Sequence, residues 1–135
     1  MSHPRILWVD TCGALLSAVL HRVVLPLFAS ELGATESALR TLGAVALGYA
    51  LFDIACLLAG PGRAPFALRV TAVANFVYPA LSAAVLAADG VPLRPLGLAY
   101  IALESLVVLS LGALEWRAAT ARIGESKQKP VSRRA

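Results

Sequence analysis

The stretch from Leu96 to Leu114 reads LGLAYIALESLVVLSLGAL and constrains the fold more than any other part of the chain. Its 19 residues contain a single charge, Glu104, near the middle. As a helix it would be ~28 Å long at ~1.5 Å per residue, about the thickness of the hydrocarbon core of a bilayer. Helices of soluble proteins seldom run this long without a polar face. The stretch therefore predicts a membrane span that carries a carboxylate in its interior.

The composition of the whole chain agrees with this prediction. Of the 135 residues, 59% are hydrophobic and only 15% are charged, whereas globular proteins average about 25% charged residues. Short connections such as GPGRAP, dense in residues that end helices, separate the apolar stretches. We therefore expect an all-α fold, an integral membrane four-helix bundle with antiparallel up-down order. Its spans are predicted at about 5–28, 38–59, 66–88 and 95–117.

These spans are expected to form one domain, residues 1–117, followed by a tail, residues 118–135. The tail ends in KQKPVSRRA and lacks apolar periodicity, which predicts a basic, disordered segment. Nine Lys and Arg residues lie at the chain ends and around the connection between the second and third spans, against three on the opposite side. Cytoplasmic segments carry such an excess. We expect a multi-pass protein of the inner (plasma) membrane with both termini cytoplasmic, in contact with lipids and not with nucleic acid.

Polar or small residues recur on one face of the spans. In the first span they are Asp10, Gly13, Ser17 and His21, and in the third they are Thr71, Asn75, Tyr78 and Ser82. Residues three or four apart share a face of a helix, so both stripes are expected to face the bundle interior. Together with polar residues of the other two spans they predict a column along the bundle axis. The candidate ligand-binding or proton-relay residues in this column are Asp10, His21, Arg22, Tyr49, Asp53, Asn75, Tyr78 and Glu104.

The column holds more acids than bases. Asp10, Asp53 and Glu104 outnumber the two residues that could neutralise them, His21 and Arg22. A charged carboxylate inside a membrane costs on the order of 3 kcal/mol, and one without a partner in a low dielectric favours its protonated form. The excess predicts a site that binds, or helps to transport, a small or amphiphilic molecule. Four short helices make a narrow bundle, so a conduit would require a homodimer, with Gly43, Ala46 and Gly48 available for close contact.

Two other functions remain open from the same residues. The protein could be a membrane subunit or scaffold whose polar residues only fix helix packing, at roughly 0.6 kcal/mol per contact. Arg22 would then pair with Glu104 or extend to the outer headgroups. The third hypothesis is an enzyme acting on a lipid or isoprenoid, with Glu104 or Asp53 as acid and Tyr78 or Tyr49 assisting.

The enzyme hypothesis ranks last because the sequence has no nucleophile elbow and no phosphate loop. Cys12 and Cys56 stand alone in apolar stretches, so neither a metal site nor thiol redox chemistry is predicted, and no cofactor is expected. A separate motif, Glu115-Trp116-Arg117, follows the last apolar stretch. A tryptophan between opposite charges is typical of a membrane interface. We favour anchoring there, with the lower end of the polar column as the alternative.

Four short motifs carry a resemblance to known proteins. They are Trp8-Val9-Asp10, Ala74-Asn75, the mid-span Glu104 and Glu115-Trp116-Arg117. With them the chain resembles uncharacterised small four-span proteins of bacterial inner membranes, over most of its length. The resemblance implies a bacterial inner-membrane setting and supplies no activity. Small multidrug-resistance transporters are similar in size, but their glutamate belongs to the first span, where this chain has Asp10 and Ser17.

Overall fold

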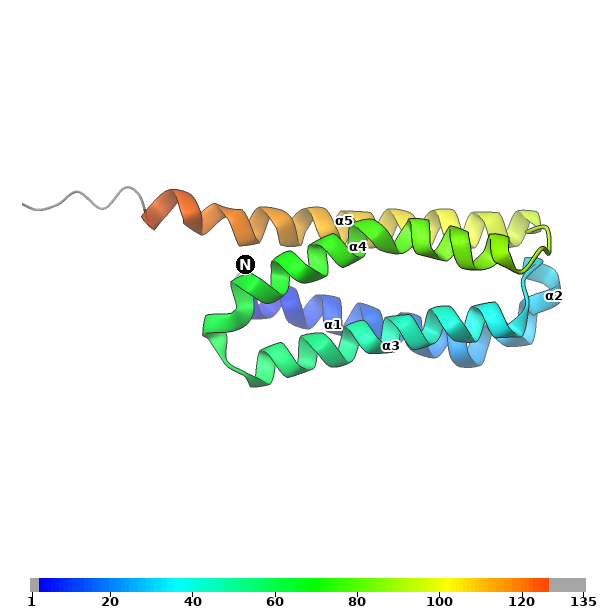
Figure 1. Ribbon diagram of the computed structural model, residues 1–135, viewed down its shortest axis with the longest axis horizontal. Coiled ribbons are helices and arrows are strands. Elements are labelled where there is room, and N and C mark those ends of the chain that lie inside the picture. The colour runs from blue at the N-terminus through cyan, green and yellow to red at the C-terminus, as the bar shows by residue number, and fades with distance from the viewer. Residues whose placement is uncertain (1–2, 127–135) are drawn as a thin grey trace, which may run out of the picture.

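The computed structural model describes residues 3–126, which contain helices and no strand (Figure 1). Four long helical segments follow one another in antiparallel order, so the described start and end of the chain lie at the same end of the bundle. The elements are α1 (His3–Val19), a π-helical turn (Leu20–Val24), a 3₁₀ turn (Leu25–Phe28), α2 (Ala29–Leu32), α3 (Glu36–Leu58), a second 3₁₀ turn (Pro61–Arg63), α4 (Ala64–Ala88) and α5 (Pro95–Ser126).

Four helical segments are long and apolar enough to cross a membrane. They are Pro4–Leu32, Glu36–Leu58, Ala64–Ala88 and Pro95–Thr120. Large apolar side chains such as Leu16, Leu58 and Leu103 are exposed on their outer faces. A water-soluble bundle would bury side chains of this kind in a core. The prediction of an all-α protein with four helices of membrane-spanning length is confirmed.

The first of these segments changes helix type near its middle. Pro26 lacks a backbone N–H and cannot continue regular α-helical hydrogen bonding. Ahead of it the helix widens into the π-helical turn, where the N–H of Leu25 donates to the carbonyl of Leu20. It then tightens into the 3₁₀ turn and continues as α2 to Leu32, beyond the end expected near residue 28. The π-helical turn carries His21, which is buried.

At the end opposite the termini, the loop between α2 and α3 is fastened to α4. Gly33 ends α2 with φ of 67°, a left-handed conformation that favours glycine. The hydroxyl oxygen of Thr35 accepts a hydrogen bond from the N–H of Ala38 at 3.2 Å and so caps α3. The same hydroxyl donates to the carboxylate of Asp89, directly after α4. These bonds fix this end of the bundle.

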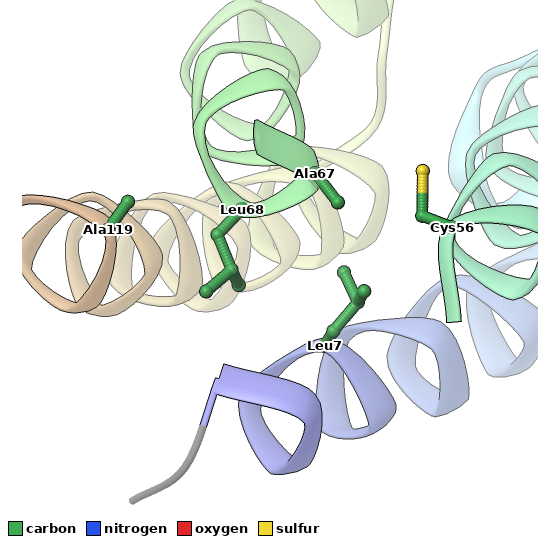
Figure 2. Packing of buried hydrophobic residues seen from close by; sticks show 5 residues of the cluster. All are labelled: Leu7, Cys56, Ala67, Leu68 and Ala119. Carbon is green, nitrogen blue, oxygen red and sulfur yellow. The ribbon is translucent and has the colours of Figure 1, made fainter. Parts of the chain in front are cut away.

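At the terminal end, apolar side chains from all four long helices meet in the centre of the bundle (Figure 2). The apolar cluster consists of Leu7 of α1, Cys56 of α3, Ala67 and Leu68 of α4 and Ala119 of α5. The free thiol of Cys56 lies among these residues as a small apolar group. Because every long helix contributes, this cluster fixes their relative positions at this end.

Helix α5 continues to Ser126, whereas its end was predicted near residue 117. The reason is packing: Ala119 is a member of the apolar cluster and Ala118 packs against it. Alanine is also the best helix former. The segment 118–135 therefore starts as helix instead of a disordered tail, and residues 127–135 lie outside the described residues.

The four long helices do not pack evenly. Helix α1 packs mainly against α3, and α4 packs mainly against α5. Contacts between α1 and α5 are sparse by comparison. The bundle is thus built from two close pairs, and the seam between α1 and α5 is open enough to accommodate a cavity.

Candidate functional site

Carboxyl groups from three helices meet in the bundle interior next to the apolar cluster. The amide nitrogen of Asn75 on α4 donates to Asp10 Oδ1 on α1 and to Glu115 Oε2 on α5, both at 3.0 Å. The hydroxyl of Thr71 donates to Asp53 Oδ1 at 2.9 Å, and the Asp53 carboxyl lies close enough to Asp10 to interact directly. All five residues are buried, Asp53 and Glu115 completely. They are termed the acid cluster below.

No ion pair of the described residues involves the acid cluster. The two ion pairs join His21 to Glu104 and Arg40 to Glu36. Two buried oxygens of the cluster, Asp53 Oδ2 and Glu115 Oε1, have no hydrogen-bond partner. Carboxyl groups this close in a low dielectric cannot all be ionised unless a proton or a cation lies between them. The acid cluster therefore holds at least one proton or cation among its carboxyl groups.

Apolar residues close the acid cluster toward the terminal end. Leu7 of the apolar cluster precedes Asp10 by three residues. Ala119 follows Glu115 by four. Spacings of three and four correspond to about one helical turn, so the apolar cluster lies one layer closer to the end of the bundle. The acid cluster is left facing the interior, in the direction of Glu104.

A second polar group surrounds Glu104, in the middle of α5. The hydroxyl of Ser17 donates to Glu104 Oε1 at 2.8 Å, and His21 Nε2 lies 3.5 Å from Glu104 Oε2. The other ring nitrogen of His21, Nδ1, lies 3.0 Å from the carbonyl oxygen of Ser17. The ring of Tyr100 meets the imidazole edge-on, with 5.7 Å between ring centroids. Ser17, His21, Tyr100 and Glu104 are termed the Glu104 group.

The hydrogen-bond partners assign the protons of the Glu104 group. Nδ1 lies 3.0 Å from the Ser17 carbonyl oxygen and 3.3 Å from the Ser17 hydroxyl, and in the tautomer with its hydrogen on Nδ1 the ring donates to the carbonyl, which only accepts. The Nε2 atom and Glu104 Oε2 then face each other, and their contact is favourable only with a proton between them. That proton makes either an imidazolium–carboxylate pair or a neutral imidazole–carboxylic acid pair. In both forms the pair holds one proton there and has no net charge.

A cavity of about 390 Å³ connects the two polar groups. Its polar wall consists of Asp10, Ser17, Tyr49, Asn75, Tyr78, Tyr100 and Glu104. The rings of Tyr49 and Tyr78 meet edge-on with centroids 6.4 Å apart. The hydroxyl of Tyr78 is buried without a hydrogen bond, although the hydroxyls of Ser17 and Ser82 lie nearby. A buried donor without a partner is costly, so this wall is suited to a polar ligand group.

The remaining wall of the cavity is apolar and belongs mostly to α1 and α5. Leu16, Leu103 and Val107 line it and are also more than half exposed on the outer surface. They lie along the sparsely packed seam between the two helices. In a membrane the cavity would open sideways to the lipid, with an apolar mouth and a polar interior.

Seven of the eight predicted site residues belong to the acid cluster, the Glu104 group or the cavity wall. These seven are Asp10, His21, Tyr49, Asp53, Asn75, Tyr78 and Glu104. Arg22 lies apart from them: its side chain is exposed, covers Gly43 of α3 and borders a surface groove together with Glu36 and Arg40. The alternative pairing of Arg22 with Glu104 is therefore not formed, because the helix directs the neighbouring His21 inward instead.

Four residues of the two polar groups were not among the eight predicted ones: Ser17 and Thr71 belonged to the predicted polar stripes, whereas Glu115 and Tyr100 did not. Glu115 was expected to anchor the membrane interface, with the lower end of the polar column as the alternative; its side chain is completely buried in the acid cluster, which agrees with the alternative. A spacing of eleven residues from Glu104, about three helical turns, was the signal for an inward position. Tyr100, which precedes Glu104 by four residues, shares its face in the same way. Trp116, next to Glu115, is exposed as expected for an interface residue.

Of the three small residues expected to contact a second copy of the chain, two lie in the bundle interior and one lies on its surface. Gly43 is packed against α1 of the same chain, and a Cβ there would lie 3.1 Å from the Ala18 carbonyl oxygen. Ala46 is buried and lines the cavity. Gly48 is open, since a Cβ added there would meet nothing within 4 Å. Only Gly48 of the three is available to another chain.

Over the described part of the chain, no group of three or more His, Cys, Asp or Glu side chains has an arrangement that could hold a metal ion. Comparison of the chain with protein-family models, with curated proteins and with solved structures gives no match. What is established is a small four-helix protein of membrane-spanning composition with two buried polar groups joined by a cavity.

Proposed function

We propose that this membrane protein binds a small amphiphilic molecule that enters from the lipid between α1 and α5. The observation that carries the proposal is the cavity of about 390 Å³, whose mouth is apolar and whose interior is polar. A ligand with an apolar part and a polar head matches this division. The unpartnered Tyr78 hydroxyl supports it, because a ligand group could supply the missing hydrogen bond.

Lateral entry follows from how the polar residues are enclosed. The apolar cluster closes the terminal end of the bundle. At the opposite end, buried Leu25, Leu32 and Leu39 form one apolar cluster, and a second contains Leu42 and Leu86. An axial pathway for water or ions is thus blocked at both ends. The seam between α1 and α5 is the route that this packing favours.

The test is native mass spectrometry of the full chain released from mild detergent. The Ala14→Phe variant places a ring in the cavity, whereas Ala102→Phe places the same ring on the exposed face of α5. We expect a retained small molecule in the wild type and in Ala102→Phe, and its loss in Ala14→Phe. Bare protein in all three samples, or a mass that survives Ala14→Phe, would contradict binding in this cavity.

One observation favours a scaffold as the second candidate function. The single side-chain amide of Asn75 hydrogen-bonds α4 to both α1 and α5, so the acid cluster also contributes to helix packing. A pure scaffold predicts that Ala14→Phe leaves the small-molecule content unchanged and that a partner protein copurifies from the native membrane. Copurification from crosslinked native membranes, with Ala102→Phe as the matched control, would separate the two candidates.

We also propose that the protein lies in a bacterial inner membrane with both termini in the cytoplasm. The support is the distribution of Lys and Arg, nine on the terminal side against three on the other. Exposed Trp8 and Trp116 both belong to the terminal end, where tryptophan would lie at the headgroups. A fluorescent protein fused to the C-terminus should be bright and a fused periplasmic alkaline phosphatase inactive; the reverse pattern would invert the orientation.

A further inference from the structure

We propose that the ligand is an organic monocation, and that it binds at Glu104 by displacing the single proton held between Glu104 and His21. This inference rests on the proposed function, because it assigns the chemical class of the molecule in the same cavity. It follows from the charge balance of the bundle interior, from the cavity wall and from the geometry of the Glu104 group.

The bundle interior contains more acidic than basic side chains. Four buried or mostly buried carboxyl groups, those of Asp10, Asp53, Glu104 and Glu115, surround one basic side chain, His21. Every arginine whose side chain the structure describes is exposed, and none of them lines the cavity. An anionic ligand would find His21 as the one basic side chain described in the interior, whereas a cation would find four carboxyl groups that can pair with it.

The cavity wall also carries aromatic rings, which attract organic cations. All three tyrosines of the chain, Tyr49, Tyr78 and Tyr100, line the cavity. Tyr78 and Tyr100 both lie close enough to Glu104 to interact with it. Aromatic rings next to a carboxylate stabilise ammonium groups through cation–π attraction, most strongly where water is excluded. A neutral polar ligand would need neither the rings nor the surplus of acids.

The exchange with a proton follows from the geometry of the Glu104 group. In the tautomer with its hydrogen on Nδ1, His21 shares one further proton with Glu104, whose Oε2 lies 3.5 Å from Nε2, and the pair is then neutral before the ligand arrives. A fixed cation beside Glu104 takes over the role of counter-charge. The proton then leaves the pair, His21 remains neutral with its hydrogen on Nδ1, and Glu104 stays ionised and bound to Ser17. One positive charge enters and one leaves, so the total charge is unchanged.

The groups that face this pair come from every neighbouring helix. Tyr100 and Glu104 belong to α5, Tyr78 to α4, Tyr49 to α3 and Asp10 to α1. The tyrosines are neutral at physiological pH. Asp10 is tied to Asn75 and belongs to the acid cluster, which is about two helical turns from Ser17 along α1. The exchangeable proton is therefore the one on the His21–Glu104 pair.

The experiment uses the full chain in mild detergent and two probes of equal shape. Benzyltrimethylammonium has a fixed positive charge and no exchangeable proton; neopentylbenzene is its uncharged carbon isostere. Calorimetry in two buffers of different ionisation enthalpy counts the protons released. We expect the cation to bind at least tenfold more tightly than the neutral probe, to release about one proton, and to bind more tightly as the pH rises.

Two variants locate the effect. Glu104→Gln keeps the shape and the bond to Ser17 but removes the charge, and should weaken cation binding at least tenfold and abolish proton release. Glu36→Gln removes a carboxylate that is exposed and paired with Arg40, and should change neither. Equal binding of both probes, no proton release, or normal cation binding to Glu104→Gln would overturn the inference.

The failures of the two proposals are distinguishable. If neopentylbenzene binds, Ala14→Phe blocks it and the cation shows no preference, the amphiphile-binding function stands and the cationic class is wrong. If neither probe binds to the wild type, both proposals are contradicted.

Discussion

The acid cluster and the Glu104 group are both built on buried carboxyl groups, yet their surroundings differ. The acid cluster joins three carboxyl groups through Asn75 and Thr71, has no basic partner and is closed by apolar residues toward the end of the bundle. Glu104 is the single carboxyl group of its polar group. It has His21 and Ser17 as partners and borders the cavity directly. The acid cluster connects the helices, whereas Glu104 has the partner that the proposed ligand would replace.

The difference shows how the same residue type serves two purposes at two depths of one bundle. Where carboxyl groups outnumber their donors, as in the acid cluster, they cannot all be ionised without a proton or a cation between them. Where a single carboxyl group has a weakly basic partner and an opening beside it, the partner can be replaced. The following variants test this contrast, starting with the largest expected effect.

Replacing the central amide should damage the protein most. Asn75→Leu is nearly the same size but removes both hydrogen bonds, to Asp10 and to Glu115. Two buried carboxyl groups would lose a donor, so we expect the free energy of unfolding to fall by about 3 kcal/mol. Unfolding in mixed detergent micelles measures this. Ser110→Leu on the exposed face of α5 is the control, and equal stability of both variants would contradict a bridging role for Asn75.

Neutralising Glu104 should have a smaller effect of the same sign. Glu104→Gln still accepts from Ser17, but it loses the shared proton with His21. We expect the free energy of unfolding to fall by about 1 kcal/mol, measured in the same micelles. A rise in stability would mean that His21 does not offset the cost of burying Glu104. Glu104 would then behave like the carboxyl groups of the acid cluster.

Neutralising a member of the acid cluster should have the opposite sign. Glu115→Gln can keep the bond from Asn75 through its amide oxygen while removing one of three uncompensated carboxyl groups. Relief of the repulsion should raise the free energy of unfolding by about 0.5 kcal/mol. Asp53→Asn, which keeps the bond from Thr71, should do the same. A loss of stability in both variants would show that hydrogen bonds within the acid cluster offset the repulsion between its carboxyl groups.

The smallest expected effect is the coupling between the two regions. Glu104 and Glu115 are eleven residues apart on one helix, or about 16 Å at ~1.5 Å per residue. Changes in stability at sites this far apart add within about 0.5 kcal/mol when no partner is shared. The double variant Glu104→Gln/Glu115→Gln should therefore equal the sum of the two singles in the micelle assay. A larger coupling would mean that the cavity connects them electrostatically.

Much of the site could be predicted from helical periodicity. The stripe of Thr71, Asn75, Tyr78 and Ser82 is buried along α4 as its spacing indicates. Glu104 could be assigned to the interior because a lone carboxylate in a long apolar stretch has to avoid lipid. Arg22 could not be placed from the sequence. His21 and Arg22 lie in the π-helical turn, and only the geometry of this turn decides which of the two side chains points into the bundle.

The sequence by itself determined the class of this protein. Four long apolar stretches and a shortage of charges dictate four helices long and apolar enough to cross a membrane, because a helix satisfies its backbone polar groups within its own segment. Tertiary structure decided which acids meet. Helix–helix rotation and depth place Glu115 beside Asp10 and leave Glu104 with His21, and these depend on packing between helices that are distant in sequence. Periodicity fixes the face of a residue; its partner across the bundle depends on how the helices pack.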